Sequence, residues 1–196
     1  MFEMTRTRVF ALALSGLVAV TTAALAADIP AKKMTDAGLY VTAAEAVTML
    51  EDPSVLFVDV RSQAEVAFLG LPRRADVNIP LMVFPEFAEF NAEKGEYKLE
   101  PNDFFVSDFQ TYAAEQGIGL NDPIIVFCRS GSRSAKAANQ LTGAGFTRVY
   151  TMLDGYEGDK AKDGPDAGHR VVNGWKNEGL EWSYRIETAQ LYPGDR

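Results

Sequence analysis

One stretch decides how this chain folds: Ile124-Ile-Val-Phe-Cys128-Arg129-Ser130-Gly131-Ser132-Arg133-Ser134-Ala135. Its first four residues form a continuous apolar run of the kind that fills a strand buried on both faces. The run delivers Cys128 to its carboxyl end, where a loop of small residues follows and a helix begins. Ligands of open α/β sheets bind at the carboxyl ends of strands. A Ser-Gly-Ser loop before a helix can turn its backbone N–H groups inward and hold negative charge. The stretch therefore predicts an anion site beside Cys128.

The composition limits the classes of protein to which the chain can belong. Its 196 residues carry 19 Lys and Arg against 27 Asp and Glu, for a net charge of −8. Nucleic-acid binding is not expected, because no basic stripe exists that would displace counterions from phosphates. One Cys and one His exclude an internal disulfide framework and any Cys-rich or multi-His metal site. We expect one globular domain.

Residues 1–26 have the three-part plan of a secretory signal. Arg6 and Arg8 give a basic start, an apolar stretch follows, and Ala24-Leu25-Ala26 is a small-x-small cleavage site. The alternative is a membrane anchor, but the stretch is only just long enough to span a bilayer and its end is weakly hydrophobic. We therefore expect cleavage and export to a bacterial periplasm, with no membrane contact once the signal is removed.

The mature chain alternates helices with short apolar strands. Strands are predicted at Val55–Val58, Pro123–Phe127 and Arg148–Met152, with a short extended piece at Val77–Pro80. Helices are predicted at Ala43–Glu51, Ser62–Phe68, Pro101–Gln116 and Arg133–Thr142. Two of them begin with capping pairs, Thr42 with Glu45 and Ser62 with Glu65. Doubly buried strands separated by helices predict a parallel α/β sheet with helices on both faces.

Three segments have a less distinct pattern. Residues 27–39 are polar and predict a mobile arm before the domain, and residues 186–196 form a C-terminal tail. Between Val77–Pro80 and Pro123–Phe127, three aromatic residues spaced three positions apart predict a helical turn that buries its rings in the core. The alternative is a hydrophobic docking patch. These aromatic residues are Phe84, Phe87 and Phe90.

Cys128 is the candidate nucleophile. A free thiol has a pKa of about 8.5, and a helix N-terminus or a neighbouring Arg lowers it to roughly 3.5–7.5. Arg129 and Arg133 add fixed positive charge, and Arg binds oxyanions through two parallel hydrogen bonds. A Cys at the end of a buried strand is often only a small apolar residue, but two Arg and several small residues in the next five positions favour function. The loop offers a thiolate that can attack the outer sulfur of an anionic donor.

The loop Cys128–Arg133 resembles the active loop of the rhodanese (thiosulfate sulfurtransferase-like) family. Further segments are similar to family motifs in the same order: Val58-Asp59-Val60-Arg61 to an early Asp-Val-Arg, Asn78-Ile79-Pro80 to an Asn-Ile-Pro, Val149–Gly155 to the strand and Gly turn after the active helix, and Asn173–Leu180 to a closing Trp helix and Gly-Leu turn. The likeness covers about residues 40–185. It implies a single domain with a five-stranded parallel sheet and helices on both faces.

The resemblance also implies a chemistry. Cys128 would take a sulfane sulfur from a small anionic donor, become a persulfide, and pass the sulfur to a thiol or cyanide-like acceptor, without a metal or organic cofactor. Asp59 and Arg61 would form a buried structural pair that supports the site, and we also expect an ionic pairing of Asp59 with a loop Arg. The remaining residues of the active loop would stabilise the persulfide, bind the donor or steady the loop: Arg129, Ser130, Gly131, Ser132, Arg133 and Ser134.

Two other functions remain open at this point. Cysteine phosphatases and arsenate reductases resemble the site, but their loop is one residue longer than the six residues from Cys128 to Arg133. The longer loop makes room for a tetrahedral phosphate, whereas the shorter one suits a persulfide. The other alternative is a non-catalytic or sulfur-carrier module that binds a basic periplasmic protein, because an acidic surface does not steer small anions toward the site.

The chain departs from the family pattern in two places. Residues 70–76 lack the family's His and are one residue longer, which alters one wall of the site. Residues 159–172 are an insertion rich in Gly, Asp and Lys. The insertion holds His169, which either recognises a partner or assists proton transfer at the site mouth, or is a solvated or capping His. Trp175 and Trp182 are expected to be packing residues.

Overall fold

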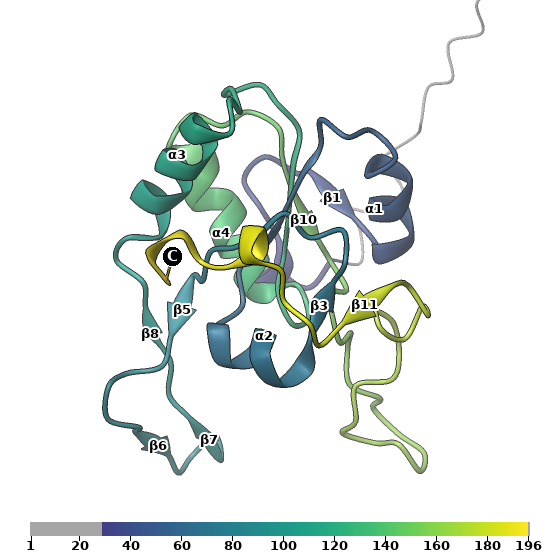
Figure 1. Ribbon diagram of the computed structural model, residues 1–196. Coiled ribbons are helices and arrows are strands. Elements are labelled where there is room, and N and C mark those ends of the chain that lie inside the picture. The colour runs from purple at the N-terminus through teal and green to yellow at the C-terminus, as the bar shows by residue number, and fades with distance from the viewer. Residues whose placement is uncertain (1–28, 196) are drawn as a thin grey trace, which may run out of the picture.

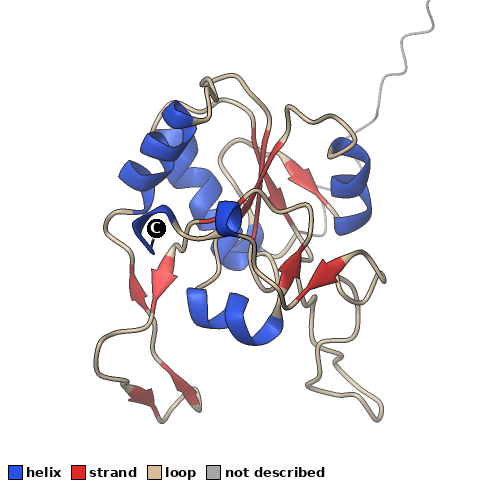
Figure 2. Ribbon diagram, in the orientation of Figure 1, coloured by secondary structure: helices blue, strands red, loops and turns tan. Residues whose placement is uncertain are grey.

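Five strands form the central sheet of the computed structural model, which describes residues 29–195 (Figures 1 and 2). Their order is β1-β10-β9-β2-β4, and all neighbouring strands run parallel, so the predicted fold class is confirmed. The predicted signal segment lies outside the described residues. No helix within residues 29–195 is long and apolar enough to cross a bilayer. The strands are β1 (Tyr40–Val41), β2 (Leu56–Asp59), β4 (Val77–Asn78), β9 (Ile124–Phe127) and β10 (Val149–Met152).

Apolar clusters cover both faces of the sheet, because successive side chains of a strand point to opposite sides. In β9, Ile124 and Val126 join a cluster with residues of α3 (Phe105–Glu115) and α4 (Ser132–Gly143). Ile125 and Phe127 join a second cluster with residues of α1 (Ala43–Met49) and α2 (Gln63–Leu69). All four side chains are fully buried. The continuous apolar runs are therefore the consequence of helices on both faces.

Both predicted capping pairs are present. The side chain of Thr42 accepts a hydrogen bond from the Glu45 amide, and the Glu45 carboxylate accepts one from the Thr42 amide at 2.7 Å. Ser62 and Glu65 make the same reciprocal bonds at the start of α2. Each box satisfies amides that a helix N-terminus leaves without an intrahelical acceptor.

The prediction that Phe84, Phe87 and Phe90 form a buried helical turn is wrong. Residues 82–101, here called the aromatic arm, form two short antiparallel pairs that project from the domain (Figure 1). Phe87 is 79% exposed and Phe90 is 59% exposed. Pro85 interrupts the spacing and cannot donate a helical hydrogen bond, and Gly95 supplies the positive φ that the turn needs. The pairs are β5 (Met82–Val83) with β8 (Glu100–Pro101) and β6 (Phe90–Asn91) with β7 (Glu96–Tyr97).

The third helix also begins later than predicted. Pro101 lies in β8, and the Asn102 side chain accepts a hydrogen bond from the Phe104 amide at 3.1 Å. This local turn competes with the helix, which is the usual behaviour of Asn. Helix α3 consequently starts at Phe105.

Both ends of the described chain pack on the domain. Residues 31–33 form a 3-10 helix in which Lys33 is 4% exposed, so the predicted mobile arm is docked. In the tail, Gln190 is buried and donates to the carbonyl of Ala75 at 2.8 Å. Before the tail, β11 (Trp182–Ser183) pairs antiparallel with β3 (Leu71–Pro72). Two further 3-10 helices, Thr188–Gln190 and Pro193–Asp195, complete the tail.

Candidate active site

Cys128 follows β9, which lies between β2 and β10 in the middle of the sheet. The loop after it ends at Gly131, the residue that precedes α4 and has a φ of 94°. A Cβ at Gly131 would lie 2.2 Å from the carbonyl oxygen of Leu153. Only glycine therefore fits both the backbone conformation and the space, and its own N–H is directed toward the thiol.

The thiol of Cys128 is held by the loop. The Gly131 N–H donates to Sγ at 3.2 Å, and the residue is 1% exposed within the cluster that α3 and α4 cover. An amide at a helix N-terminus stabilises negative charge on this sulfur. The thiol is therefore nearly shielded from solvent.

A second segment supports the loop from behind. The carbonyl of Cys128 accepts from the Tyr156 amide at 2.8 Å, and the carbonyl of Arg129 accepts from the Glu157 amide at 2.9 Å. A Cβ at Gly155 would lie 2.6 Å from the Ser130 amide nitrogen. The glycine turn after β10 is thus required for close approach of two backbones, and it fixes the loop relative to the sheet.

Arg133 connects the active loop to α2. Its two terminal nitrogens donate to the two carboxylate oxygens of Glu65, each at 2.6 Å. Burial alone would raise the pKa of Glu65, but the hydrogen bonds and charge of Arg133 and the Ser62 amide lower it to about 2. The same carboxylate closes the capping box of α2. Arg133 is therefore a positioning residue whose fork is already occupied.

Arg129 lies at the exposed rim of the site. Its Nε donates to the Glu157 carboxylate, and its side chain is 45% exposed. This pair adds a side-chain contact to the backbone bonds between the loop and its supporting segment. Unlike Arg133, the guanidinium of Arg129 retains an exposed part that faces solvent.

Asp59 and Arg61 form a buried pair under the site. Both side chains are 0% exposed, and Arg61 Nε donates to Asp59 at 2.9 Å. The guanidinium also donates to the carbonyl of Gly70 and lies 4.0 Å from the ring centre of Tyr156. The predicted buried pair is confirmed, whereas the further expectation that Asp59 pairs with a loop Arg is wrong, because Arg61 binds both of its oxygens.

The serines of the loop differ in role. Ser134 is buried and donates to the carbonyl of Gly131 at 3.0 Å, while it accepts from the Thr151 hydroxyl at 2.8 Å. This chain of bonds ties the start of α4 to β10. Ser130 and Ser132 are partly exposed, so they lie on the side of the loop that solvent reaches.

The structure describes both segments that depart from the family pattern. Residues 71–72 of the altered segment pair with β11, and Gly70 approaches the Trp182 ring closely. In the insertion, the side chain of His169 is 72% exposed and lies 3.9 Å from Asp166. Trp175 is buried with its ring centre 5.3 Å from that of Phe57, which makes it a packing residue.

Sequence reasoning missed the carboxylates that anchor the loop. Glu65 was recognisable as a cap but not as the partner of Arg133, which is 68 positions away. Glu157 and Asp159 follow the glycine turn. Because the chain has 27 Asp and Glu, the sequence alone does not distinguish these two from the other acidic residues. Asp159 receives both hydrogen bonds of the buried Lys33 ammonium at 2.8 Å.

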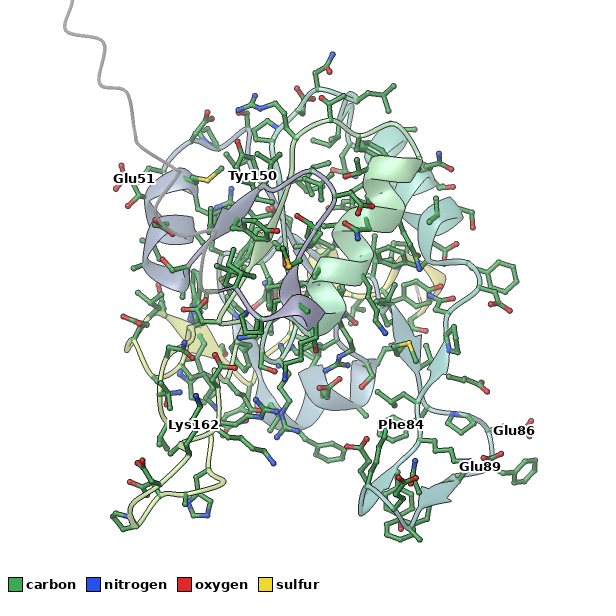
Figure 3. The ribbon with its side chains drawn as sticks, turned by 180° about the vertical axis from the view of Figure 1, so that it is seen from behind. Glu51, Phe84, Glu86, Glu89, Tyr150 and Lys162 are labelled. Atoms are coloured by element: carbon green, nitrogen blue, oxygen red, sulfur yellow. The ribbon has the colours of Figure 1, made fainter. Side chains whose placement is uncertain are left out.

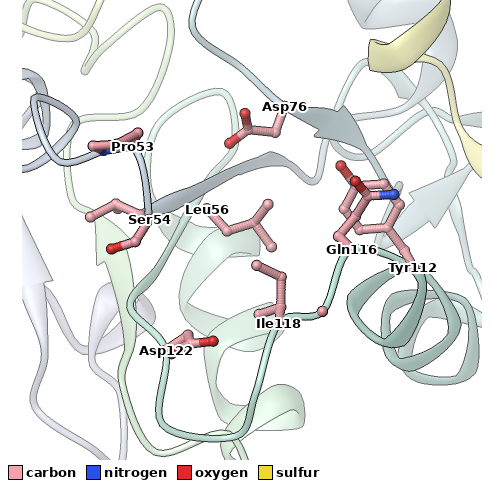
Figure 4. A pocket seen from close by; sticks show the side chains of 10 residues that line it. Pro53, Ser54, Leu56, Asp76, Tyr112, Gln116, Ile118 and Asp122 are labelled. Carbon is pink, nitrogen blue, oxygen red and sulfur yellow. The ribbon is translucent and has the colours of Figure 1, made fainter.

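A surface pocket of about 350 Å³ lies at the opposite end of the sheet from Cys128 (Figure 4). It is lined by residues that precede β2 and β9, among them Ser54 and Asp122, by Tyr112 of α3, and by Gln116, which follows α3. Its lining holds no Cys or His. Within residues 29–195, no group of three His, Cys, Asp or Glu side chains is placed to hold a metal ion.

Several known proteins are similar to this chain in sequence or in structure. The crystal structure of Rv0390 from M. tuberculosis is 31% identical, has a TM-score of 0.55, and aligns with 74% of this chain and 96% of its own. Uncharacterized protein RP600 of Rickettsia prowazekii is 27% identical over 131 residues, 67% of this chain and 85% of that protein. Thiosulfate sulfurtransferase 16, chloroplastic, of Arabidopsis thaliana is 53% identical over 38 residues, 19% of this chain and 32% of its own. The family described as Rhodanese-like domain matches residues 42–162, and the chain belongs to that family.

Proposed function

We propose that this protein is a sulfurtransferase that moves a sulfane sulfur through a persulfide on Cys128. The observation that carries the proposal is the hydrogen bond from the Gly131 amide to Sγ, 3.2 Å long, at the start of α4. A sulfur held in this way is stabilised as the anion, which is the nucleophilic form. Membership of the rhodanese-like family is consistent with this chemistry.

The reaction is a double displacement. The Cys128 thiolate attacks the outer sulfur of a donor such as thiosulfate. A new S–S bond forms at Cys128, the S–S bond of the donor breaks, and sulfite leaves with the electron pair. An acceptor such as cyanide then attacks the outer sulfur of the persulfide, thiocyanate leaves, and the thiolate is regenerated. Neither step needs an external oxidant or a metal.

The length of the loop supports sulfur transfer over phosphate chemistry. Gly131, the third residue after the thiol, already places its amide on Sγ. The fork of Arg133, which would be the oxyanion ligand in a phosphatase-like site, is bound to both oxygens of Glu65. A tetrahedral phosphate would have to displace that pair, whereas a single outer sulfur would not.

The test is thiocyanate formation from thiosulfate and cyanide by wild type and Cys128→Ala. We expect activity only in wild type. In parallel, the intact mass of wild type incubated with thiosulfate should increase by one sulfur atom that cyanide removes, and Cys128→Ala should show no such species. Equal activity in the two proteins would refute the proposal, and so would hydrolysis of an aryl phosphate without any sulfur transfer.

We also propose that residues 1–26 direct export and are removed, so that the protein acts in the periplasm. The basic start, apolar stretch and small-x-small site support this. N-terminal sequencing of protein recovered from a periplasmic fraction should begin at residue 27. Recovery of the uncleaved chain from membranes would support the anchor instead.

A second candidate function is delivery of the sulfur to a basic partner protein. The aromatic arm favours it, because Phe87, Phe90 and Tyr97 are more than half exposed on a segment that also carries Glu86 and Glu89 (Figure 3). Exposed aromatic rings among carboxylates suit a cationic protein surface. Transfer of radiolabelled sulfur from Cys128 to a protein in a periplasmic extract should be lost in Phe87→Ser/Phe90→Ser, with thiosulfate:cyanide turnover unchanged.

A further inference from the structure

The insertion of residues 159–172 is attached near its end to Gly158, which directly follows the segment that supports the active loop. Lys160 and Arg170 form an antiparallel bridge, and the Ala161 amide donates to the carbonyl of His169 at 2.8 Å. Arg170 then reaches across the base, where Nη1 donates to the carbonyl of Gly158 at 2.6 Å. Gly158 directly follows Glu157, the partner of Arg129. The fold thereby brings a cation from the end of the insertion to the segment that supports the active loop.

Arg170 differs from the other cations around the loop. Lys33, Arg129 and Arg133 each form an ion pair with a carboxylate. Arg170 makes none within the described residues, although Asp and Glu outnumber Lys and Arg in the chain. Its Nε is buried and has no hydrogen-bond partner in that part of the chain. Nη1 donates to Gly158, so the edge formed by Nε and Nη2 remains for a ligand. A guanidinium can use this edge to bind an oxyanion through two hydrogen bonds.

Arg170 lies beside the segment that supports the active loop, because it bonds to Gly158, the residue after Glu157. Burial lowers its pKa first, and the positive charge of Arg129 lowers it further, whereas Glu157, Asp159 and Cys128 raise it. Because Arg129 pairs with Glu157 and Arg170 bonds to the next residue, Gly158, the same short segment holds both guanidiniums. An anion between the two guanidiniums would relieve the repulsion and complete the hydrogen bonds of Arg170.

We propose that Arg170 is a donor-recognition residue that, together with Arg129, binds the oxyanion end of an anionic sulfur donor beside Cys128. This inference rests on the proposed sulfurtransferase function and assigns the insertion a role in choosing the donor. A sulfonate group on the donor would lie against the Nε–Nη2 edge, and its outer sulfur would face Sγ. Donors without a terminal anion gain nothing from Arg170.

The first experiment measures the site's preference for anions without any sulfur transfer. The rates at which iodoacetate and iodoacetamide alkylate Cys128 are compared in wild type, Arg170→Gln, Arg170→Lys and the control Arg148→Gln. Arg148 is exposed and precedes β10, at the far end of the sheet from Cys128. We expect the iodoacetate-to-iodoacetamide ratio to fall several-fold in Arg170→Gln, to fall less in Arg170→Lys, and to stay at the wild-type value in Arg148→Gln.

The second experiment uses the donors themselves. The KM for thiosulfate should rise roughly tenfold in Arg170→Gln, the size expected for one charge-assisted interaction, with partial rescue in Arg170→Lys. Turnover of an uncharged organic trisulfide should be unchanged. An unaltered alkylation ratio together with an unaltered KM for thiosulfate would overturn the inference. Equal loss with charged and uncharged donors would also overturn it, because that is the result of a purely structural role. If wild type transfers no sulfur from any donor, the proposed function fails, and the alkylation ratio still reports whether Arg170 attracts anions.

Discussion

The aromatic arm and the insertion project from the same end of the molecule, with α2 drawn between them (Figures 1 and 3). Phe84 and Glu86 mark the arm in Figure 3, and Lys162 marks the insertion. The arm bonds mainly to itself, through β5–β8, β6–β7 and the exposed pair of Lys98 with Glu89. The first residue of the insertion, Asp159, bonds to the buried Lys33, and Arg170 near its end bonds to Gly158, which follows the support of the active loop. Exposure therefore does not reveal which projection belongs to the site, whereas the hydrogen bonds at its base do.

A matched pair of glycine substitutions gives the largest contrast between the two projections. Gly158 at the base of the insertion and Gly95 in the arm both have positive φ. A Cβ at Gly158 would lie 1.7 Å from the carbonyl oxygen of Asn173, whereas nothing lies within 4 Å of a Cβ at Gly95. We expect Gly158→Ala to lower the free energy of unfolding by at least about 3 kcal/mol and Gly95→Ala by about 1–2 kcal/mol, both measured by urea unfolding.

The activities of the same pair sharpen this contrast. Gly158→Ala should also abolish most thiocyanate formation in the fraction that remains folded, because the support of Arg129 moves. Gly95→Ala should keep wild-type turnover. Comparable losses in the two variants would show that the arm and the insertion are equally coupled to the site.

The sequence was most informative where a local pattern has one structural solution. The apolar run before Cys128 and the two capping boxes predicted the central strand, the loop and two helix starts correctly. The aromatic arm was not predictable, because a spacing of three indicates a buried face only where another element packs against it, and Pro85 interrupts the helical hydrogen bonds. The ion pairs of the loop were not predictable, since Arg133 and Glu65 meet only when α2 and α4 pack on the same sheet end.

That pair lies between the two projections and supplies the next largest effect. The carboxyl of Glu65 ordinarily has a pKa of 4.5, and the folded protein lowers it to about 2. A pKa that folding lowers contributes stability above its unfolded value, and that stability is lost as the pH falls through the folded value. The contribution should be about 3 kcal/mol at neutral pH and should disappear progressively from about pH 4.5 to pH 2.

Glu65→Gln tests this contribution directly. The variant should be less stable than wild type by about 2–3 kcal/mol at pH 7, and the difference should shrink to near zero at pH 2. Thermal unfolding over this pH range measures it. A difference that stays constant with pH would mean that the charge on Glu65 contributes nothing and that Arg133 is held by packing alone.

A smaller contrast comes from the lysine pairs of the two projections. The side chain of Lys33 is 5% exposed and pairs with Asp159 of the insertion, whereas that of Lys98 is 52% exposed and pairs with Glu89 of the arm. We expect Lys33→Met to lower the free energy of unfolding by about 1–2 kcal/mol and Lys98→Met by less than about 0.5 kcal/mol. Added salt should weaken the second effect further and leave most of the first. Equal losses of stability in the two variants would show that the buried ion pair contributes no more than the surface ion pair.

The smallest effect is expected at the tip of the arm. Phe87 is 79% exposed, so Phe87→Ser removes almost no buried apolar area and should change the free energy of unfolding by less than about 0.5 kcal/mol. Phe109 in α3 is fully buried and is the matched control, because Phe109→Ala should lower that free energy by about 3–5 kcal/mol. Turnover of thiosulfate and cyanide by Phe87→Ser should equal that of wild type. A clear loss of stability in Phe87→Ser would show that the ring packs against the domain. A clear loss of small-donor turnover would show that the arm contributes to the active site.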